Sequence, residues 1–251
     1  MFKEYFILLL LAHIIGDFYL QNQSMADKKE YSIKWLLFHC LCYWAAVMIA
    51  LVPIMSLKVV VFGTVQAILH AIIDVGKFAE IYILKKNKKL MPLKERNIFV
   101  LDQALHVTSI VIIAYLFVLQ DGTISVSSGV SQFFKIIGVS GISLVSMAAA
   151  LLIIHKPANI TIFKLLGVYK PGTKEDLVKK DYNAGRFIGT VERIIMLIFI
   201  SIGQYSAVGL VLTAKSIARY DRISKEKDFA EYYLLGTLLS TVIVIITALL
   251  L

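Results

Sequence analysis

The sequence predicts an all-α protein of the multi-pass membrane class, a polytopic bundle of about eight transmembrane helices. Its composition is the first reason: 59% of the 251 residues are apolar and 17% are charged. Soluble domains average about 45–50% apolar and about 25% charged residues. The second reason is that the apolar residues gather in long runs, such as 136–154 and 232–251. Such runs match a hydrocarbon core of about 30 Å at about 1.5 Å per helical residue.

The apolar runs place the expected helices in order along the chain. The first run carries His13 and Asp17 and lacks a small-residue cleavage site, so we expect a retained helix instead of a signal peptide. The expected spans are 2–20, 34–52, 57–84, 97–119, 133–154, 186–203, 204–220 and 229–251. The sixth and seventh could instead form one long helix, because little polar sequence separates them.

The distribution of lysine and arginine predicts the orientation. These residues crowd the connections after the first, third, fifth and seventh spans, whereas the connections around Pro53 and at 120–132 contain none. Positively charged connections stay in the cytoplasm. All of them do so only if both termini lie outside and Gly203 and Gln204 form a tight external turn. We therefore expect a hairpin there, in a protein of the bacterial cytoplasmic (inner) membrane.

These spans divide the chain into three parts. Residues 1–155 form a first membrane half of five helices, 156–185 a cytoplasmic loop, and 186–251 a second membrane half of three helices. Within the loop, 160–168 is amphipathic enough to lie on the membrane surface, and Thr173 fits the cap of a short helix.

Charge and cysteine content narrow the functional classes. The net charge of +9 arises mostly from the connections between spans, which indicates membrane topology and no nucleic-acid partner. The two cysteines, Cys40 and Cys42, face different sides of one helix and are poorly placed for a disulfide.

Ionisable residues concentrate in the first four spans. Four of the five histidines lie there, and three of them form pairs with aspartates four residues away: His13 with Asp17, His70 with Asp74, and Asp102 with His106. Residues four apart share a helix face, so each pair offers an imidazole and a carboxylate to the same neighbour. The order is reversed in the fourth span, which runs in the opposite direction to the first and third. All three pairs, together with His39 in the second span, therefore fall in one layer near the cytoplasmic face.

Such a layer predicts a divalent metal site. Burying an aspartate at the bilayer centre costs roughly 2.5–3.5 kcal/mol on insertion scales, so these side chains must face partners. Three carboxylates also need a compensating positive charge. Mixed His and Asp ligands suit zinc first, then iron or manganese, and suit calcium less. The alternatives are His–Asp hydrogen bonds that hold the bundle together and a pathway for protons or ions.

Other polar residues of this half have weaker assignments. Lys77 could neutralise Asp74 or contact an anionic substrate, although we expect it to extend to the membrane interface. Four glutamines are candidates for orienting metal ligands: Gln21, Gln23, Gln66 and Gln103.

The second half carries its own charged residues on the cytoplasmic side. The candidates for holding a substrate headgroup are Glu192, Arg193, Lys215, Arg219 and Glu231, together with Lys77 from the first half. The residues of the second half could form a basic pocket for a phosphate or carboxylate. We favour ordinary ion pairing, in which Lys215 or Arg219 neutralises Glu192, because acidic residues accompany the basic ones.

Several segments resemble a bacterial family of multi-pass membrane proteins of unknown function. They lie at 13–21, 70–77, 102–106, 189–193, 214–219 and 231–237, with patterns HxxxDFxxQ, HxxxDxxK and DQxxH followed by GxxER, AKSxxR and EYxxxGT. The resemblance spans nearly the whole chain and implies that both polar clusters belong to one architecture, but it implies no reaction. In chemistry alone, the polar layer is similar to intramembrane metal-dependent hydrolases such as alkaline ceramidases and adiponectin receptors.

The leading functional hypothesis is an intramembrane hydrolase acting on a membrane lipid or another amphiphile. His13, His70 and His106 would be the main metal ligands, and His39 a fourth ligand or proton shuttle. The aspartates would divide between metal ligation and general-base catalysis: Asp17, Asp74 and Asp102. Seven candidate ligands exceed the need of one ion, which weakens this hypothesis or suggests two ions. The rivals are a carrier for a divalent cation or small ion and an accessory or sensing protein.

Overall fold

The computed structural model describes residues 1–88, 91–169 and 175–251, and for 175–184 it describes the backbone alone. Within these ranges the secondary structure is helical and contains no strand, so the all-α prediction is confirmed. The chain divides into two compact units, Met1–Ala149 and Ala150–Leu251.

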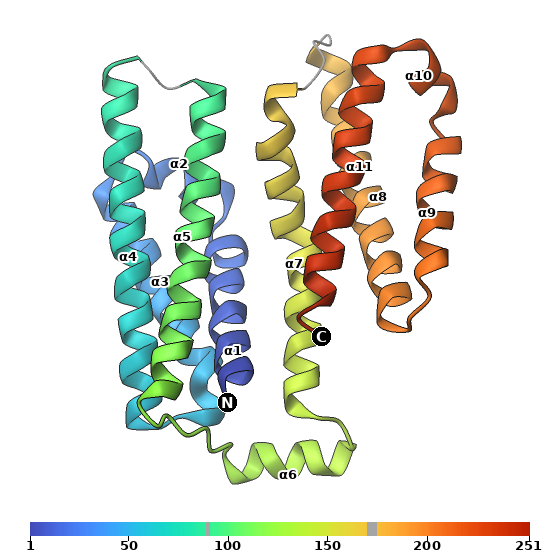
Figure 1. Cartoon of the computed structure of the whole chain (residues 1–251). Coiled ribbons are helices and arrows are strands. Elements are labelled where there is room, and N and C mark those ends of the chain that lie inside the picture. Colours follow the sequence, from blue (N-terminus) through green and yellow to red (C-terminus); the bar gives the residue numbers. More distant parts are fainter. Residues whose placement is uncertain (89–90, 170–174) are drawn as a thin grey trace. The chain divides into compact units, whose positions relative to one another are not determined.

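The first unit is built on four helices that pack in a ring. They are α1 (Phe2–Ile14), α3 (Ile33–Leu51), α4 (Leu57–Lys86) and α5 (Pro92–Leu119). Contacts join α1 to α3, α3 to α4, α4 to α5, and α5 back to α1. Figure 1 shows the four helices side by side in this unit.

Shorter elements connect these helices. A π-helix, η1 (Ile15–Leu20), continues α1 and is followed by the short α2 (Gln23–Lys29), which leaves the direction of α1 and η1 by 93°. The 3₁₀ turn η2 (Val52–Ile54) joins α3 to α4, and the amphipathic α6 (Ser128–Ile137) follows α5. Helix α2 packs on α3. Figure 1 shows α2 crossing the bundle toward the end at which α4 joins α5.

The buried stripe of each long helix changes character along its length. On α4 the buried residues are apolar or small near the start, as at Val59 and Gly63, and ionisable further on, at His70 and Asp74. The apolar half of the core is closed by Tyr5, whose ring stacks on that of Phe117 with the centroids 4.1 Å apart. The polar layer therefore lies next to a closely packed apolar half of the core.

The second unit is formed by helices from the C-terminal part of the chain. Helix α7 (Gly141–Leu166) enters it and ends in the 3₁₀ turn η3 (Gly167–Tyr169). It is followed by α8 (Glu175–Ser201), α9 (Tyr205–Ile217), α10 (Tyr220–Lys225) and α11 (Lys227–Ala248). Helix α8 packs on both α9 and α11, and the buried core includes Ile154, Met196, Leu197 and Val244.

The described residues contain five helices that are long and apolar enough to cross a membrane, or six if the bent pair Phe2–Leu20 and Gln23–Lys29 forms one span. The expected sixth and seventh spans are two packed helices with a break between Ser201 and Tyr205, as the hairpin interpretation required. Gly203 permits this turn, because its φ of +74° lies in the left-handed region that side chains disfavour.

The fifth expected span, 133–154, is wrong at both ends. Helix α6 stops at Ile137, and Gly138 with φ of +68° breaks the apolar run before α7 begins at Gly141. At the other end α7 continues through Pro157 to Leu166. A proline inside a helix loosens the preceding turn, and here Arg193 Nε donates to the carbonyl of Ile154 at 2.6 Å.

This extension replaces part of the expected loop. The segment 160–168, expected to lie on the membrane surface as part of the loop, is the end of α7 together with the first residues of η3. Thr173, expected as a helix cap, lies outside the described residues.

Candidate metal centre

The ionisable side chains of the first unit project from its four long helices into the polar half of the core. His13 lies on α1, His39 on α3, His70 on α4 and His106 on α5, and all four are buried. The expectation that these helices carry a common polar layer therefore describes the structure well. Asp17 lies in η1, and π-helical turns within α-helices frequently mark functional sites.

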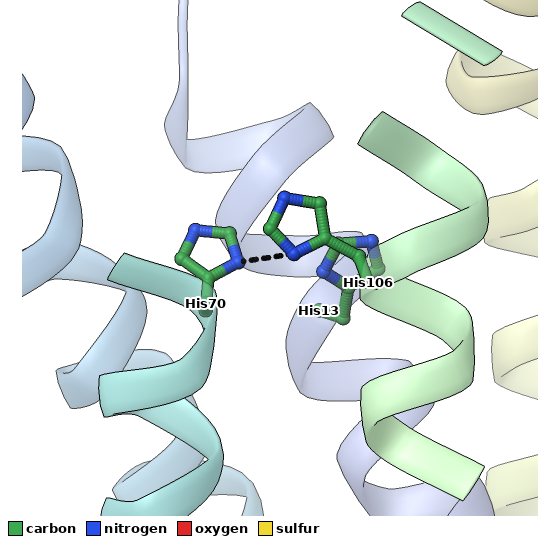
Figure 2. Close-up of side chains that lie close together, drawn as sticks. All are labelled: His13, His70 and His106. Carbon is green, nitrogen blue, oxygen red and sulfur yellow. Dashed lines mark hydrogen bonds between the residues drawn. The ribbon is translucent and has the colours of Figure 1, made fainter. Parts of the chain in front are cut away.

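Three imidazoles form the centre of this layer. Ring nitrogens of His13, His70 and His106 lie within 4.8 Å of one another, and these residues are 2%, 0% and 0% exposed. The Nδ1 atoms of His70 and His106 are 3.1 Å apart, as the dashed line in Figure 2 marks. Among the described residues, neither ring nitrogen of His13 has a hydrogen-bond partner. Three helices thus direct buried nitrogen atoms at one point.

The opposite nitrogens of two of these rings face carboxylates. His70 Nε2 lies 3.3 Å from Asp17 Oδ1 and 3.7 Å from Asp74 Oδ2. His106 Nε2 lies 3.4 Å from Asp102 Oδ1 and 3.7 Å from Asp74 Oδ1. A carboxylate beside Nε2 favours a proton on that nitrogen, and a neutral ring then keeps its lone pair on Nδ1. This is the usual arrangement of a metal-binding histidine.

Two further groups of candidate ligands overlap this centre. One consists of Asp17, His39 and His70, and the other of Asp74, Asp102 and His106. His39 Nε2 lies 3.2 Å from Asp17 Oδ1 and 3.3 Å from both His70 Nε2 and Asp74 Oδ2. A neutral imidazole has one lone pair, so His70 can serve the centre through Nδ1 or the neighbouring group through Nε2. The groups are overlapping alternatives that share ligands.

Two lysines already neutralise part of the layer. Lys77 Nζ lies 2.7 Å from Asp102 Oδ2, so it neutralises a carboxylate of the layer, although this carboxylate is Asp102 and not Asp74 as considered from the sequence. Lys29 on α2, expected only as a charge in a connection, is buried and places Nζ 3.1 Å from Asp74 Oδ2. Two of the three carboxylates thus have ammonium partners, and a metal ion is not needed to balance all three.

Tyr43 is a second residue that the sequence analysis missed. Its ring stacks on that of His70 with a centroid distance of 3.5 Å and an interplanar angle of 2°. A Cβ at Gly16 would lie 2.7 Å from Tyr43 Cδ2, so glycine is required for this close approach. Tyr43 follows His39 by four residues on α3, and this spacing could have indicated that both face the layer.

The glutamines have different positions. Gln103 Nε2 donates to Asp102 Oδ2 at 3.1 Å, as expected of a residue that orients a carboxylate. Gln66 is buried beneath the histidines and donates to Ser109 Oγ at 3.0 Å, whereas Gln23 bonds to Asp27.

The candidate charged residues of the second unit have different surroundings. Glu192 Oε2 and Lys215 Nζ are 2.6 Å apart, which is the ion pair that the sequence favoured. Arg193 is 2% exposed, and its NH2 group donates to Asn159 Oδ1 and Thr190 Oγ1. Two further candidates, Arg219 and Glu231, are exposed. Arg193 therefore acts within this unit as a hydrogen-bonding residue between helices.

A family model described as protein of unknown function (DUF3307) matches residues 5–134. The chain belongs to this family. The DUF3307 segment extends from α1 into α6 and contains every histidine, aspartate and lysine of the polar layer. The family resemblance expected over nearly the whole chain is thus shown for this segment alone. No curated protein and no solved structure matches the chain.

Proposed function

We propose that the DUF3307 segment holds a divalent metal ion within the membrane and uses it to hydrolyse a lipid or another amphiphile. The observation that carries this proposal is the convergence of three buried imidazoles from three helices, His13, His70 and His106. Three histidines with a fourth position left for water or substrate are a common ligand set of catalytic zinc. Zinc is the expected ion, with iron or manganese as alternatives.

The distances are compatible with such an ion. Zinc–nitrogen bonds of about 2.0–2.1 Å in a tetrahedral shell separate neighbouring nitrogens by roughly 3.3–3.4 Å. The separation of 3.1 Å between His70 Nδ1 and His106 Nδ1 is close to this value. If both nitrogens carried protons they would repel each other at that distance, whereas an ion between them uses both lone pairs.

The carboxylates then have separate tasks. Asp102 Oδ1 and Asp74 Oδ1 lie 3.4 Å and 3.7 Å from His106 Nε2, and both carboxylates are bonded to lysines, so we assign them to ligand orientation. Asp17 has histidine partners and no lysine within ion-pair distance in the described chain. Its Oδ1 faces His70 Nε2, so we assign the general-base role to its other oxygen, Oδ2, which lies 3.9 Å from Nε2 of the ligand His13. A divalent ion can lower the pKa of a coordinated water to about 7, which such a base can deprotonate.

The proposed setting is the bacterial cytoplasmic membrane, with eight spans and both termini outside. The support is that the polar layer lies in the half of the bundle that ends in the basic α4–α5 connection, and such connections stay in the cytoplasm. The site would then meet amphiphiles of the inner leaflet.

Transport of a divalent cation or small ion is the second candidate. The observation that favours it is the overlap of two ligand groups at His70, whose Nδ1 faces His106 and whose Nε2 faces Asp17. An ion could move between these groups by exchanging one ring nitrogen for the other. Beneath them, the bonded pair Gln66 and Ser109 continues the polar side chains into the bundle.

Metal analysis of the detergent-purified protein tests the site. We expect one zinc ion per chain in the wild type and none in His13→Ala, His70→Ala or His106→Ala. His155→Ala, which changes the one histidine outside the layer, is the control and should retain the ion. A wild-type protein without stoichiometric metal under zinc-replete conditions would end the proposal. Zinc-dependent turnover of a lipid panel, compared with zinc flux into proteoliposomes, separates hydrolase from carrier.

A further inference from the structure

Counted with neutral histidines, the polar layer changes from a net negative to a net positive charge when a divalent ion binds. Three carboxylates and two ammonium groups, with neutral histidines, sum to −3 + 2 = −1. A divalent ion raises this sum to +1. Because the surrounding apolar helices solvate charge poorly, the metal-loaded layer is expected to attract one additional negative charge.

Lys77 is the most exposed charged residue of the polar layer. Its side chain is 23% exposed, compared with 11% for Lys29, 8% for Asp17 and 2% for both Asp74 and Asp102. Lys77 is therefore the charged residue of the layer that an incoming group meets first. An ammonium group has three donors, and the bond to Asp102 Oδ2 uses one of them. A ligand that binds there would be separated from His106 by one carboxylate.

We propose, on the basis of the proposed metal site, that its substrate carries a monoanionic group, a phosphodiester or a carboxylate, which Lys77 binds when the metal is present. One negative charge brings the layer from +1 to neutrality. A zwitterionic or neutral headgroup would leave it at +1, and a dianionic phosphate monoester would bring it back to −1. Lysine binds phosphate oxygens as a compact point charge, which suits this class.

The test measures lipid binding to the zinc-loaded, full-length protein in nanodiscs of phosphatidylglycerol, which is monoanionic, and of phosphatidylcholine, which is zwitterionic. We expect a preference of about tenfold or more for the monoanionic lipid, the size of a charge-assisted hydrogen bond. Lys77→Met should lose the preference, and Lys77→Arg, which keeps the charge, should retain it. Lys85→Met removes a lysine that pairs with Glu30 and is the control for general attraction to basic connections.

Titration with dimethyl phosphate separates the two sources of the anion. Binding of dimethyl phosphate in detergent shows that the soluble group suffices, whereas binding of the lipid alone assigns the site to a membrane headgroup, and both results support the proposal. Equal binding of both lipids by zinc-loaded protein, or a preference that survives Lys77→Met, overturns it while the metal site stands. Protein that binds no zinc overturns both.

Discussion

The replacement of Asp102 by asparagine is the sharpest test of the assigned coordination. In this structure Asp102 Oδ1 lies 3.4 Å from His106 Nε2, on the side of the ring away from the proposed ion. Asparagine keeps the shape but removes the negative charge that holds the Nε2 proton. Loss of such an outer partner typically lowers metal affinity about 10–100-fold, or about 1.4–2.8 kcal/mol. We expect a loss of zinc affinity in this range, measured by competition with a chelating dye.

Two variants isolate the cause of this loss. Asp102→Asn also leaves Lys77 without its 2.7 Å partner, so the double variant with Lys77→Met restores the charge balance without restoring the carboxylate. It should remain as weak in zinc binding as the single variant. Asp121→Asn, an equally conservative change just beyond the end of α5, is the control.

Two other results for Asp102→Asn would change the role assigned to Asp102. Zinc affinity within about threefold of the wild type would refute the orienting role, because it lies below the range expected for an outer partner. Complete loss of zinc, equal to that of His106→Ala, would instead make Asp102 a direct ligand and favour the group of Asp74, Asp102 and His106.

Two further predictions concern packing. Gly16→Ala places a Cβ 2.7 Å from Tyr43, so it should lower the free energy of unfolding by about 1–3 kcal/mol and weaken zinc binding. Gly76→Ala is the control, because its Cβ would have no atom within 4 Å, and it should change neither property. Equal melting temperatures of the two variants in detergent would contradict this prediction. Arg193→Met removes the donor to the Ile154 carbonyl and should lower the free energy of thermal unfolding by about 1–3 kcal/mol. It should leave the zinc stoichiometry unchanged, because the polar layer belongs to the other unit. A change in zinc content would show that the two units are coupled.

The structure corrects the expected boundaries where local and long-range effects compete. Hydrophobicity alone joined 133–140 to the span that follows, but Gly138 adopts a left-handed conformation that ends α6. The apolar run ended the expected span at Ile154, yet α7 continues through Pro157 to Leu166, and Arg193 on α8 bonds to the carbonyl of Ile154 in the turn before the proline. A residue 39 positions away supplies that bond, so the short-range pattern did not contain it.

The polar layer was predictable because helical periodicity acts over four residues. The spacing of His13 with Asp17, and the reversed order of Asp102 and His106 in an antiparallel helix, place these groups at one depth without knowledge of packing. Composition likewise determined the helical, membrane-compatible class, because long apolar runs have few other stable arrangements.

Only the tertiary structure decided how the layer is organised. Which ring nitrogen faces a carboxylate depends on side-chain rotamers and on the stacking of Tyr43 against His70. The burial of Lys29 depends on the bend of 93° between the segment ending at Leu20 and α2, which carries a residue of an ordinary basic connection to Asp74. Such contacts arise between segments far apart in sequence, and their geometry is set by the packing of the whole bundle rather than by any local pattern.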